Sequence, residues 1–599
     1  MQKRNDLQIL RGLAVLLVVL YHFKVAGFSR GFLGVDIFFV ISGYLMALLY
    51  DKGTVREFYK RRIDRLLPAY VFVIVASSIV GYWLLIPIEF NQLYEQALAG
   101  IFFVNNFQFW LQDSYFSSSA FNPLLNLWSL SVEVQFYLIV PFIYLMIRNK
   151  PKVFILVFVL SFVSCLVVLL VSPKTAFFMM PFRIWEFMAG AYVAWKARPA
   201  GSVGVGFQWA ALLLLIAAVV LYPLEPNTKS VALGHPGLAS LLVVCLAAVI
   251  IYIGLPLNLE RGLIGRSMRR LGDISYSVYL VHFPIIVFWN YLEFGGTNLY
   301  YSSLLDLGLM LCLTLGLALL LYVFIETRFA HYFRSGAVRA ALILSILPIV
   351  ILASELNKKR FTNEQIAIFS GVTDVTEFRC GKLYPYLNPS AVSCNLGVEN
   401  LPKRVMLVGN SHADAIKESF TRIANRNDYS VSFLVSNQPL LDRSITVEQI
   451  MDSISASQVE ALFLHFNAQV YSEPIFKTNL LSLVGLAKSK GIAVVLLEPV
   501  PSYETSVPQT AYLATQGDSA LSDLLVQQHT FDNSVSNLIG DLSGLGVTTY
   551  RLRDVFCSLG EGCRALGYQS QPYYYDAHHL NLTGAAMLEP LFQSAFEKL

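Results

Sequence analysis

The feature that most constrains this chain is a series of long apolar stretches in its first 355 residues. A helix of roughly 16–24 apolar residues is long enough to cross the hydrocarbon core of a bilayer. We predict eleven such spans, at 7–25, 32–50, 67–87, 126–147, 152–172, 178–196, 207–223, 236–254, 273–293, 302–325 and 338–354. The whole chain is 55% hydrophobic and 14% charged, which is too apolar for an ordinary soluble protein. The first part is therefore expected to be a polytopic α-helical membrane bundle.

The basic residues test this number of spans, because short cytoplasmic loops collect Lys and Arg. Basic clusters occur in alternate loops, at 3–11, 52–65, 148–152, 196–198, 261–270 and 328–339. Eleven spans place all of these clusters on one side, with the N-terminus cytoplasmic and the chain after the last span outside. A twelfth span at 92–111 would invert the later loops. Its polar residues favour a re-entrant or interfacial helix instead.

The first apolar run, 7–23, lacks a small-residue cleavage site and leads into another apolar run. We therefore interpret it as the first span and not as a cleaved signal peptide. The net charge of +4 is modest and gives no reason to expect nucleic acid as a partner.

The chain after residue 400 has a different pattern. Strand-like runs at 404–408, 430–435, 461–465, 492–497 and 547–552 alternate with helical patterns at 411–425, 477–490, 519–541 and 582–598. This alternation is typical of a doubly wound α/β domain, with a parallel sheet covered on both faces. We expect a membrane domain at 1–335, a linking span and lead-in segment without clear periodicity at 336–400, and the α/β domain at 401–599.

Four of the seven cysteines lie in this polar C-terminal part. Their short separations favour the pairs Cys380–Cys394 and Cys557–Cys563, although four free thiols are the alternative. Paired cysteines would place the α/β domain in an oxidising compartment, which agrees with an extracytoplasmic position.

Ionisable residues inside membrane spans are costly and usually functional. We single out six, five of which lie in the outer half of the predicted bundle: His22, Asp36, Glu133, Arg183, Glu186 and His282. A shared polar cavity that opens outward would allow them to pair and hydrate. Separate ion pairs that join helices, such as Arg183–Glu133, are the alternative.

Arg11 and His22 lie on one helix face, because eleven residues turn a helix about 20° past three full turns, with a rise of roughly 16 Å. Histidine can act as a general base near neutral pH. Arg11 and the arginines at 61, 62 and 65 could hold phosphates at the inner mouth of the bundle. The simpler interpretations are that His22 is a hydrogen-bonded core residue and that the arginines only fix the membrane topology.

The Arg11-x10-His22 pattern resembles the signature of the acyltransferase-3 family of membrane acyltransferases. Further stretches over roughly residues 5–335 are similar to that family in the same order: Gly34–Tyr44, Phe58–Arg65 with Pro68, Leu127–Glu133 with 135–137, Arg183–Glu186, and Ser275–His282 with Pro284. Asn126 stands where many relatives have His, so we assign it no proton-transfer role.

The resemblance implies that acyl-CoA is the donor on the cytoplasmic side and that His22 is the central catalytic residue. It also implies that Arg11, Arg62 and Arg65 are needed for activity, with the coenzyme A phosphates as their expected ligands. We expect no bound cofactor and no metal site.

In the α/β domain, the apolar run 405–408 leads into Ser411 at the start of a helical pattern. Parallel sheets bind ligands at this end of their strands, and helix N-termini stabilise oxyanions there. Asp576 and His579 lie three residues apart near the C-terminus, so one loop can supply a base and the carboxylate that orients it. The alternative is that Ser, Asp and His occur at these positions by chance.

This domain resembles the SGNH hydrolase family, which implies that Ser411 is the nucleophile, His579 the base and Asp576 its orienter. Asn410 stands where the family usually has Asp, and the glycine of the second block has no clear counterpart at 436–442. Asn467 is the candidate oxyanion-hole residue.

The fusion of the two parts resembles the O-acetyltransferases of bacterial surface polysaccharides, such as O-antigen acetylases. It implies a bacterial inner-membrane enzyme that passes an acyl group, expected to be acetyl, from cytoplasmic acyl-CoA to an extracytoplasmic glycan, which can be lipid-linked. In one alternative, the membrane domain is the whole transferase and acts on peptidoglycan or capsule, while the outer domain is an esterase or a glycan-binding module. In another, the chain is a non-catalytic transporter of an acylated carrier.

Overall fold

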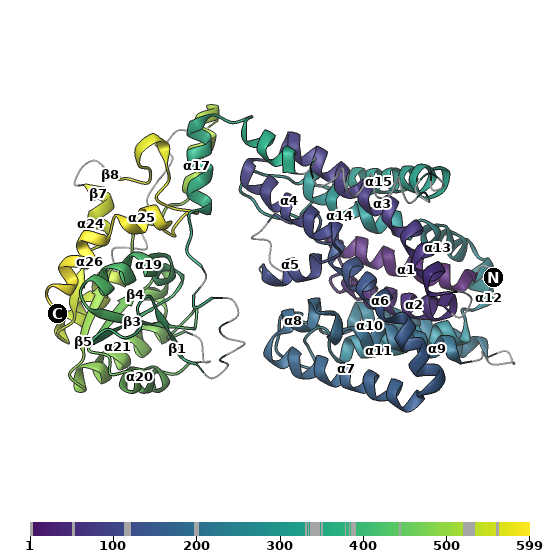
Figure 1. Ribbon diagram of the computed structural model, residues 1–599, viewed down its shortest axis with the longest axis horizontal. Coiled ribbons are helices and arrows are strands. Elements are labelled where there is room, and N and C mark those ends of the chain that lie inside the picture. Colours follow the sequence, from purple (N-terminus) through teal and green to yellow (C-terminus); the bar gives the residue numbers. More distant parts are fainter. Residues whose placement is uncertain are drawn as a thin grey trace. The chain divides into compact units, whose positions relative to one another are not determined.

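The computed structural model describes most of the chain, namely residues 4–50, 54–112, 121–196, 203–329, 332, 335, 348, 351–377, 379–381, 384, 388, 391–441, 445–518, 534–558 and 562–599. The chain divides into two compact units, Met1–Asn357 and Lys358–Leu599. Each unit is described separately below, and both are drawn in Figure 1.

Helices are the only secondary-structure elements among the described residues of the first unit (Figure 1). Its elements are α1 Asn5–His22, η1 Gly31–Leu33, α2 Gly34–Tyr50, α3 Val55–Leu84, α4 Pro87–Ile101, α5 Asn105–Leu111, α6 Leu127–Asn149, α7 Pro151–Val171, α8 Pro173–Phe178, η2 Met180–Phe182, α9 Ile184–Trp195, α10 Val205–Leu221, α11 Leu238–Ile253, α12 Leu257–Arg261, α13 Leu263–Asp273, α14 Ser275–Trp289, α15 Leu304–Leu320 and the π-helix η3 Leu321–Arg328.

Six helices among the described residues are long and apolar enough to cross a membrane: α1, η1 with α2, α3, α6, α7, and α15 with η3. A seventh span results if α13 and α14, which meet at a 74° bend, count as one. The helices α10 and α11 are apolar but shorter. The structure thus contains a multi-pass bundle, and the number of eleven spans stays a prediction.

Most of the predicted spans coincide with helices, but their ends differ. The span expected at 178–196 contains α9, which has only 12 residues. The stretch 92–111 falls on α4 and α5, which are separated by a break at 102–104, and neither is among the candidate spans. Most of the stretch 338–354 lies outside the described residues.

Two glycines allow α2 and α9 to pack closely. A Cβ atom on Gly43 of α2 would lie 1.9 Å from the carbonyl oxygen of Phe187, and one on Gly190 of α9 would lie 1.9 Å from that of Val40. Small residues at helix crossings let backbones approach in membrane proteins, where van der Waals contact drives association. The position of α9 against α2 therefore depends on these two residues.

We expect Gly190→Ala to destabilise the first unit, because the added methyl group forces α9 away from α2, at a cost of about 1–3 kcal/mol. Gly316→Ala on α15 is the matched control, since no heavy atom lies within 4 Å of a Cβ atom there. Thermal unfolding of the purified protein in detergent measures both. Equal melting temperatures for the two variants would contradict the proposed role of this contact.

The second unit is built around a six-stranded sheet with the order β1-β3-β2-β4-β5-β6. The strands are β1 Ser393–Leu396, β2 Lys403–Gly409, β3 Tyr429–Leu434, β4 Ala461–His465, β5 Ala493–Leu497 and β6 Thr548–Tyr550. All neighbours are parallel except β1, which runs antiparallel to β3. The five predicted strand runs are confirmed, and β1 is an additional edge strand within the predicted lead-in segment.

The helices of this unit cover both faces of the sheet (Figure 1). Alternate strand residues face opposite ways: Leu407 and Phe463 pack in one core with α19 Ser411–Arg426 and α26 Glu589–Phe596. Met406 and Leu464 pack in the other core with α20 Val447–Ala456, α21 Pro474–Ser489 and α23 Ser534–Gly544. The doubly wound α/β architecture that the sequence predicted is therefore present.

The remaining elements of the second unit are short. They are α17 Asn363–Thr373, η5 Ala468–Ser472, α22 Val507–Gln516, α24 Arg553–Phe556, β7 Cys557–Ser558, β8 Gly562–Cys563, η7 Tyr568–Ser570 and α25 Leu582–Ala586. The helix α17 begins with a capping box formed by Thr362 and Gln365, although no periodicity was expected there. Of the helix predicted at 519–541, residues 519–533 lie outside the described residues and the rest belongs to α23.

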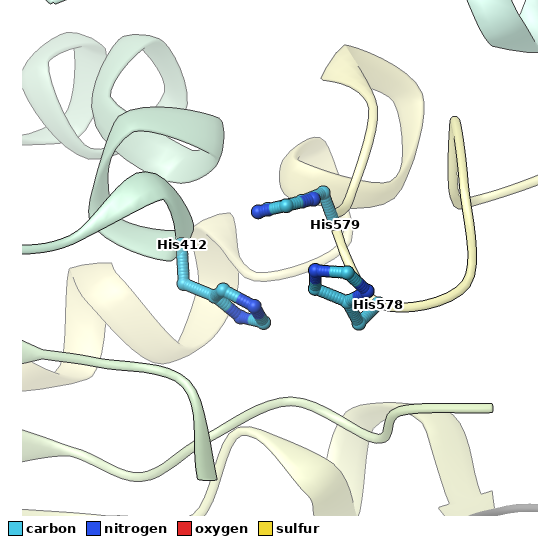
Figure 2. A group of neighbouring side chains, drawn as sticks. All are labelled: His412, His578 and His579. Carbon is cyan, nitrogen blue, oxygen red and sulfur yellow. The ribbon is translucent and has the colours of Figure 1, made fainter. Parts of the chain in front are cut away.

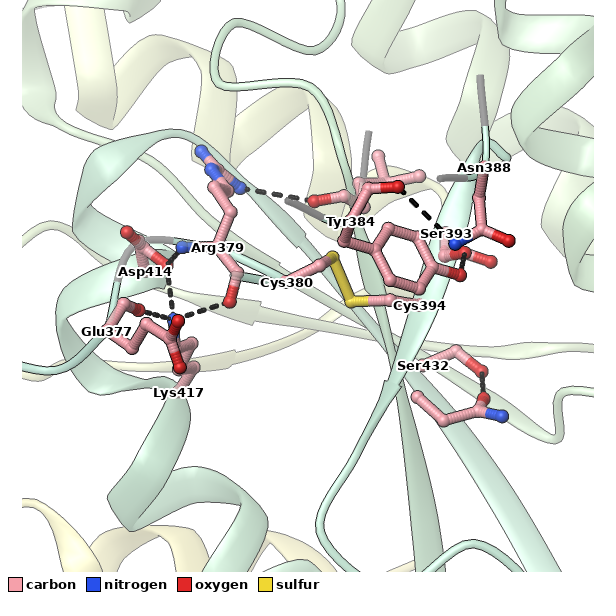
Figure 3. Close-up of a disulfide and its surroundings, with 12 residues drawn as sticks. Glu377, Arg379, Cys380, Tyr384, Asn388, Ser393, Cys394, Asp414, Lys417 and Ser432 are labelled. Carbon is pink, nitrogen blue, oxygen red and sulfur yellow. Dashed lines mark hydrogen bonds and ion pairs between the residues drawn. A yellow bond between two sulfur atoms is a disulfide. The ribbon is translucent and has the colours of Figure 1, made fainter. Parts of the chain in front are cut away.

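Both predicted disulfides, Cys380–Cys394 and Cys557–Cys563, are present. Figure 3 shows the first of them, which joins the segment before β1 to β1 itself. The three cysteines of the first unit, at 165, 245 and 312, are free.

Candidate active sites

Ser411, His579 and Asp576 form a continuous row of hydrogen bonds in the second unit. The Oγ atom of Ser411 lies 2.7 Å from Nε2 of His579, and Nδ1 of His579 lies 2.7 Å from Oδ2 of Asp576. A carboxylate oxygen only accepts, so Nδ1 carries the hydrogen and the neutral ring presents Nε2 as an acceptor to the Ser411 hydroxyl. These are the contacts by which a base removes the proton of a nucleophile.

The loop before α25 holds Asp576 and His579 in place. Oδ1 of Asp576 accepts hydrogen bonds from the backbone N–H groups of His578 and His579, both at 2.8 Å. Burial alone would raise the pKa of Asp576, but hydrogen bonding to His579 and the nearby histidines lower the pKa below its usual value. The carboxylate therefore stays ionised at neutral pH and can stabilise a protonated His579.

The sheet topology explains why Ser411 lies where it does. Strand β2 ends at Gly409, and the chain turns at Asn410 into α19, whose first residue is Ser411. Strand β2 is flanked by β3 on one side and β4 on the other, so the direction of chain winding reverses next to it. Parallel sheets bind ligands at such a switch point. A Cβ atom at Gly409 would lie 1.9 Å from the carbonyl oxygen of His465, so this turn requires glycine.

Asn410 ties the turn after β2 to the turn after β4. Its Oδ1 accepts from the backbone N–H groups of His412 at 3.1 Å and Asn467 at 3.3 Å, and its Nδ2 donates to Oδ1 of Asn467 at 2.9 Å. The sequence singled out Asn410 as a departure and Asn467 as the candidate oxyanion donor. The structure brings both next to Ser411, with the amide oxygen of Asn467 held by Asn410.

Arg379 is a residue of this site that the sequence did not indicate (Figure 3). The residue is 4% exposed, and its guanidinium donates to the carbonyl oxygen of Gly409 at 3.0 Å and to Oδ1 of Asn437 at 2.8 Å. Burial lowers the pKa of Arg379 to about 10, so it remains charged at neutral pH. The side chain connects the strand before the nucleophile to the loop after β3. Only the three-dimensional structure shows this, because Arg379 lies in the segment without periodicity.

Three further histidines surround the Ser411–His579–Asp576 row. His412 is 1% exposed, and burial, followed by the proximity of His579, His465 and His578, lowers the pKa of His412 well below its usual value. Burial also lowers the pKa of His465 to about 4, and lowers that of His578. These imidazoles are therefore neutral at neutral pH.

In the first unit, His22 and His282 form a buried pair. Nδ1 of His22 lies 3.0 Å from Nε2 of His282, and Nδ1 of His282 lies 2.7 Å from the carbonyl oxygen of Tyr279. A carbonyl oxygen only accepts, so Nδ1 of His282 carries the hydrogen and its Nε2 is the acceptor in the neutral ring. His22 must then donate from Nδ1, which leaves its Nε2 as the basic nitrogen. This arrangement prepares His22 to accept a proton.

Arg183, Asp36 and Glu186 form a second buried group, and all three are 0% exposed. Arg183 lies 3.0 Å from Asp36 and 3.0 Å from Glu186. His235 was not predicted from the sequence. Its Nε2 lies 3.3 Å from the guanidinium of Arg183, and its Nδ1 is hydrogen-bonded to Oγ of Ser240 at 3.0 Å. The ion pairs thus join α2 to α9, and the pair Arg183–Glu133 that the alternative suggested does not form.

Glu133 belongs to a third group, in a pocket that also contains three of the predicted arginines. Its charged lining residues are Arg11, Arg62, Arg65 and Glu133, and its polar ones include Ser42, Ser129, Tyr137 and Tyr279. Ser42 and Tyr137 both donate to Oε1 of Glu133. Much of the remaining lining is apolar and comes from α2.

Among the described residues, the six ionisable residues of the predicted spans fall into three groups of hydrogen bonds and ion pairs. The grouping follows from the bonds of each side chain: His22 pairs with His282, Asp36 and Glu186 pair with Arg183, and Glu133 accepts from Ser42 and Tyr137. Tyr279 lines the pocket with the arginines, its hydroxyl lies 2.5 Å from that of Ser129, and its carbonyl oxygen is bonded to His282. Tyr279 thus contacts both this pocket and the histidine pair.

Comparison with known proteins assigns both units. Residues 4–323 match the family described as "Acyltransferase domain", and residues 379–594 match the one described as "SGNH domain (fused to AT3 domains)". The first match covers more than half of the chain. The chain belongs to the acyltransferase-3 family.

Individual proteins similar to this acyltransferase share about a third of its residues over little more than half of the chain. It is 30% identical over 348 residues to "O-acetyltransferase OatA" of Staphylococcus aureus, which covers 53% of this chain and 56% of the relative. It is 32% identical over 352 residues to "Putative membrane-bound transacylase BcsY" of Komagataeibacter xylinus, which covers 56% of this chain and 86% of that protein. The chain thus spans little more than half the length of OatA.

Among solved structures, the periplasmic domain of a Salmonella ser. Paratyphi A lipopolysaccharide acetyltransferase aligns with a TM-score of 0.31 and 14% identity. The alignment covers 39% of this chain and 97% of that domain.

We expect Ser411 of this acyltransferase to react with a fluorophosphonate probe, because His579 accepts its proton. His579→Ala should slow labelling at least about 100-fold, since it removes the base. Ser411→Ala should abolish labelling, whereas Ser419→Ala, a buried serine on the same helix, should leave the rate unchanged. Mass spectrometry of the labelled peptide identifies the modified residue. Labelling that persists in Ser411→Ala would contradict this assignment.

Proposed function

We propose that this protein is a multi-pass membrane O-acyltransferase that moves an acyl group, with acetyl the expected one, from cytoplasmic acyl-CoA to a hydroxyl of an extracytoplasmic glycan. The observation that carries this proposal is the continuous Ser411–His579–Asp576 row in a chain whose first unit is an acyltransferase domain. Lipopolysaccharide O-antigen is the acceptor we favour, presented free or on a lipid carrier. The name of OatA, an O-acetyltransferase, supports the reaction class.

The proposed orientation places the N-terminus in the cytoplasm and the second unit in the periplasm of a bacterial cell with an inner membrane. Two observations support it. The basic loops alternate in the way expected of cytoplasmic loops, and both disulfides lie in the second unit, as expected for an oxidising compartment.

In the first half of the proposed reaction, acyl-CoA binds with its phosphates against Arg11, Arg62 and Arg65, and its thioester points toward the histidine pair. An arginine guanidinium binds phosphate oxygens with paired hydrogen bonds. A hydroxyl, either that of the next acceptor or that of a carrier, attacks the thioester carbonyl and gives its proton to Nε2 of His22. The carbon–sulfur bond breaks and His22 passes the proton to the coenzyme A thiolate, so that the acyl ester and free coenzyme A are the products. The acyl group is small and uncharged, so it can cross the bundle where the charged coenzyme cannot.

In the second half, Oγ of Ser411 attacks the carbonyl carbon of the incoming acyl group while His579 takes the hydroxyl proton. The acyl donor leaves with that proton, and Ser411 carries the acyl ester. A sugar hydroxyl then gives its proton to His579 and attacks the ester, which releases the acylated glycan and restores Ser411. Asp576 stabilises the protonated imidazole at both stages.

We expect Arg62→Ala to weaken the binding of acetyl-CoA at least about tenfold, because one charged hydrogen-bonding partner of a phosphate is lost. The neighbouring Arg61→Ala is the matched control, since Arg61 is exposed and is not among the residues that line the pocket. Equilibrium binding to the purified protein in detergent measures both. Equal affinities for the two variants would place the coenzyme elsewhere.

The proposal as a whole is tested by incorporation of labelled acetate into purified surface polysaccharide. Cells express the wild type, His22→Ala or Ser411→Ala, with membrane levels matched. We expect both substitutions to reduce the label at least about 100-fold, because each removes a group in direct contact with the reacting atoms.

A different result would identify another division of labour. Loss of label in His22→Ala together with normal or increased label in Ser411→Ala would overturn the relay. The membrane unit would then be the complete transferase, and the second unit an esterase or a glycan-binding module. Normal label in both variants would exclude a catalytic role for His22 and for Ser411.

A further inference from the structure

Three histidines meet beside Ser411, and the proposed reaction uses only one of them (Figure 2). His412 follows Ser411 on α19, while His578 and His579 come from the loop that carries Asp576. One ring nitrogen from each of the three histidines can be chosen so that all lie within 4.8 Å of one another. The rings of His412 and His578 are stacked, with centroids 5.4 Å apart.

His412 is the unusual member of this group. It is 1% exposed, and neither of its ring nitrogens has a hydrogen-bond partner among the described residues. A buried polar group without a partner costs about 1–3 kcal/mol. The ring faces the imidazoles of His578 and His579 (Figure 2). Imidazole is a preferred ligand of transition-metal ions, so the three rings could bind one ion together.

We propose that His412, His578 and His579 form a binding site for a divalent transition-metal ion, with Zn²⁺ as the expected one, and that the bound ion inhibits the second unit. Three imidazoles are the donor set of many zinc sites that keep a fourth position open. Mg²⁺ and Ca²⁺ prefer oxygen ligands, so they do not fit this group. Neutral imidazole is the form that binds metal.

The three rings must approach slightly to bind one ion. Nitrogens on a tetrahedral zinc ion, with Zn–N bonds of about 2.0–2.1 Å, lie about 3.3 Å apart. His578 can supply most of this movement, because its side chain is 40% exposed. His412 and His579 are held by the helix and by Asp576, so they form the fixed part of the site.

We expect inhibition because the ion would bind the lone pair of Nε2 of His579. Nδ1 of His579 is protonated and bonded to Asp576, so Nε2 is the nitrogen available to a metal ion. The same lone pair accepts the hydroxyl proton of Ser411. A metal ion on Nε2 therefore removes the base from the nucleophile. This second part of the inference rests on the proposed function, whereas metal binding does not.

Binding is tested in full-length Ser411→Ala protein, which keeps all three histidines and lacks the nucleophile. The protein in detergent is stripped with EDTA and titrated with ZnCl2, and bound metal is counted by mass spectrometry. We expect one Zn²⁺ per chain and a raised melting temperature. Adding His578→Ala, at an exposed position, should weaken this binding at least about tenfold, since one of three ligands is lost.

Arg422→Ala in the same background is the control, because Arg422 is an exposed residue of α19 outside the cluster. It should bind Zn²⁺ like the parent. No stoichiometric Zn²⁺ in the parent, or equal affinity in the parent and the His578→Ala variant, would overturn the metal site.

Inhibition is measured in protein with Ser411 intact, by the rate of fluorophosphonate labelling. Zn²⁺ should suppress labelling, EDTA should restore it, and His578→Ala should reduce the sensitivity to Zn²⁺. Stoichiometric binding without any loss of labelling would overturn the inhibitory part. If metal-free protein is not labelled at all, the proposed role of Ser411 fails, and the binding experiment in Ser411→Ala still decides the metal site.

Discussion

The first unit depends on a guanidinium that is completely buried. Arg183 is in contact with Asp36 and Glu186, and removing one partner of such a group typically costs 3–5 kcal/mol, because a charge is left alone in an apolar interior. The ion pair with Asp36 fixes α9 against α2, where Gly43 and Gly190 let the two backbones approach. Helix α2 in turn provides much of the wall of the pocket with the arginines. The shape of that pocket is therefore linked to Arg183, although Arg183 does not line it.

The two units prepare a histidine in the same way. In the second unit, Nδ1 of His579 donates to a carboxylate, and in the first unit Nδ1 of His22 donates to the neutral ring of His282. In both units Nε2 is left as the basic nitrogen. The partners differ in charge, and this difference has a consequence. Asp576 stabilises a protonated partner, while the neutral ring of His282 orients His22 without contributing a negative charge.

The sequence predicted much of this fold from simple patterns. Apolar stretches indicated the helical bundle, and five strand-like runs indicated the strands of the parallel sheet. It did not indicate β1, which has only four residues, or α17, although the Thr362–Gln365 capping box at the start of α17 is a local sequence signal. The spacing of apolar residues also did not indicate the 74° bend between α13 and α14.

The candidate sites show the same limit. Ser411, Asp576 and His579 could be found from the sequence because strand ends and short loops are local features. The division of the membrane residues into three groups could not, since it depends on which helices are neighbours. Arg379 and His235 were missed because each lies in an irregular segment, and its partners are distant in sequence.

The tautomer of His282 limits where a proton can travel in the first unit. His22 can share a proton with His282, because Nε2 of His282 is able to accept it. The next atom beyond is the carbonyl oxygen of Tyr279, which cannot take up a proton and pass it on. The pair is thus a closed end and not part of a conducting chain. A proton that His22 passes to His282 can therefore return only to His22 along this row of hydrogen bonds.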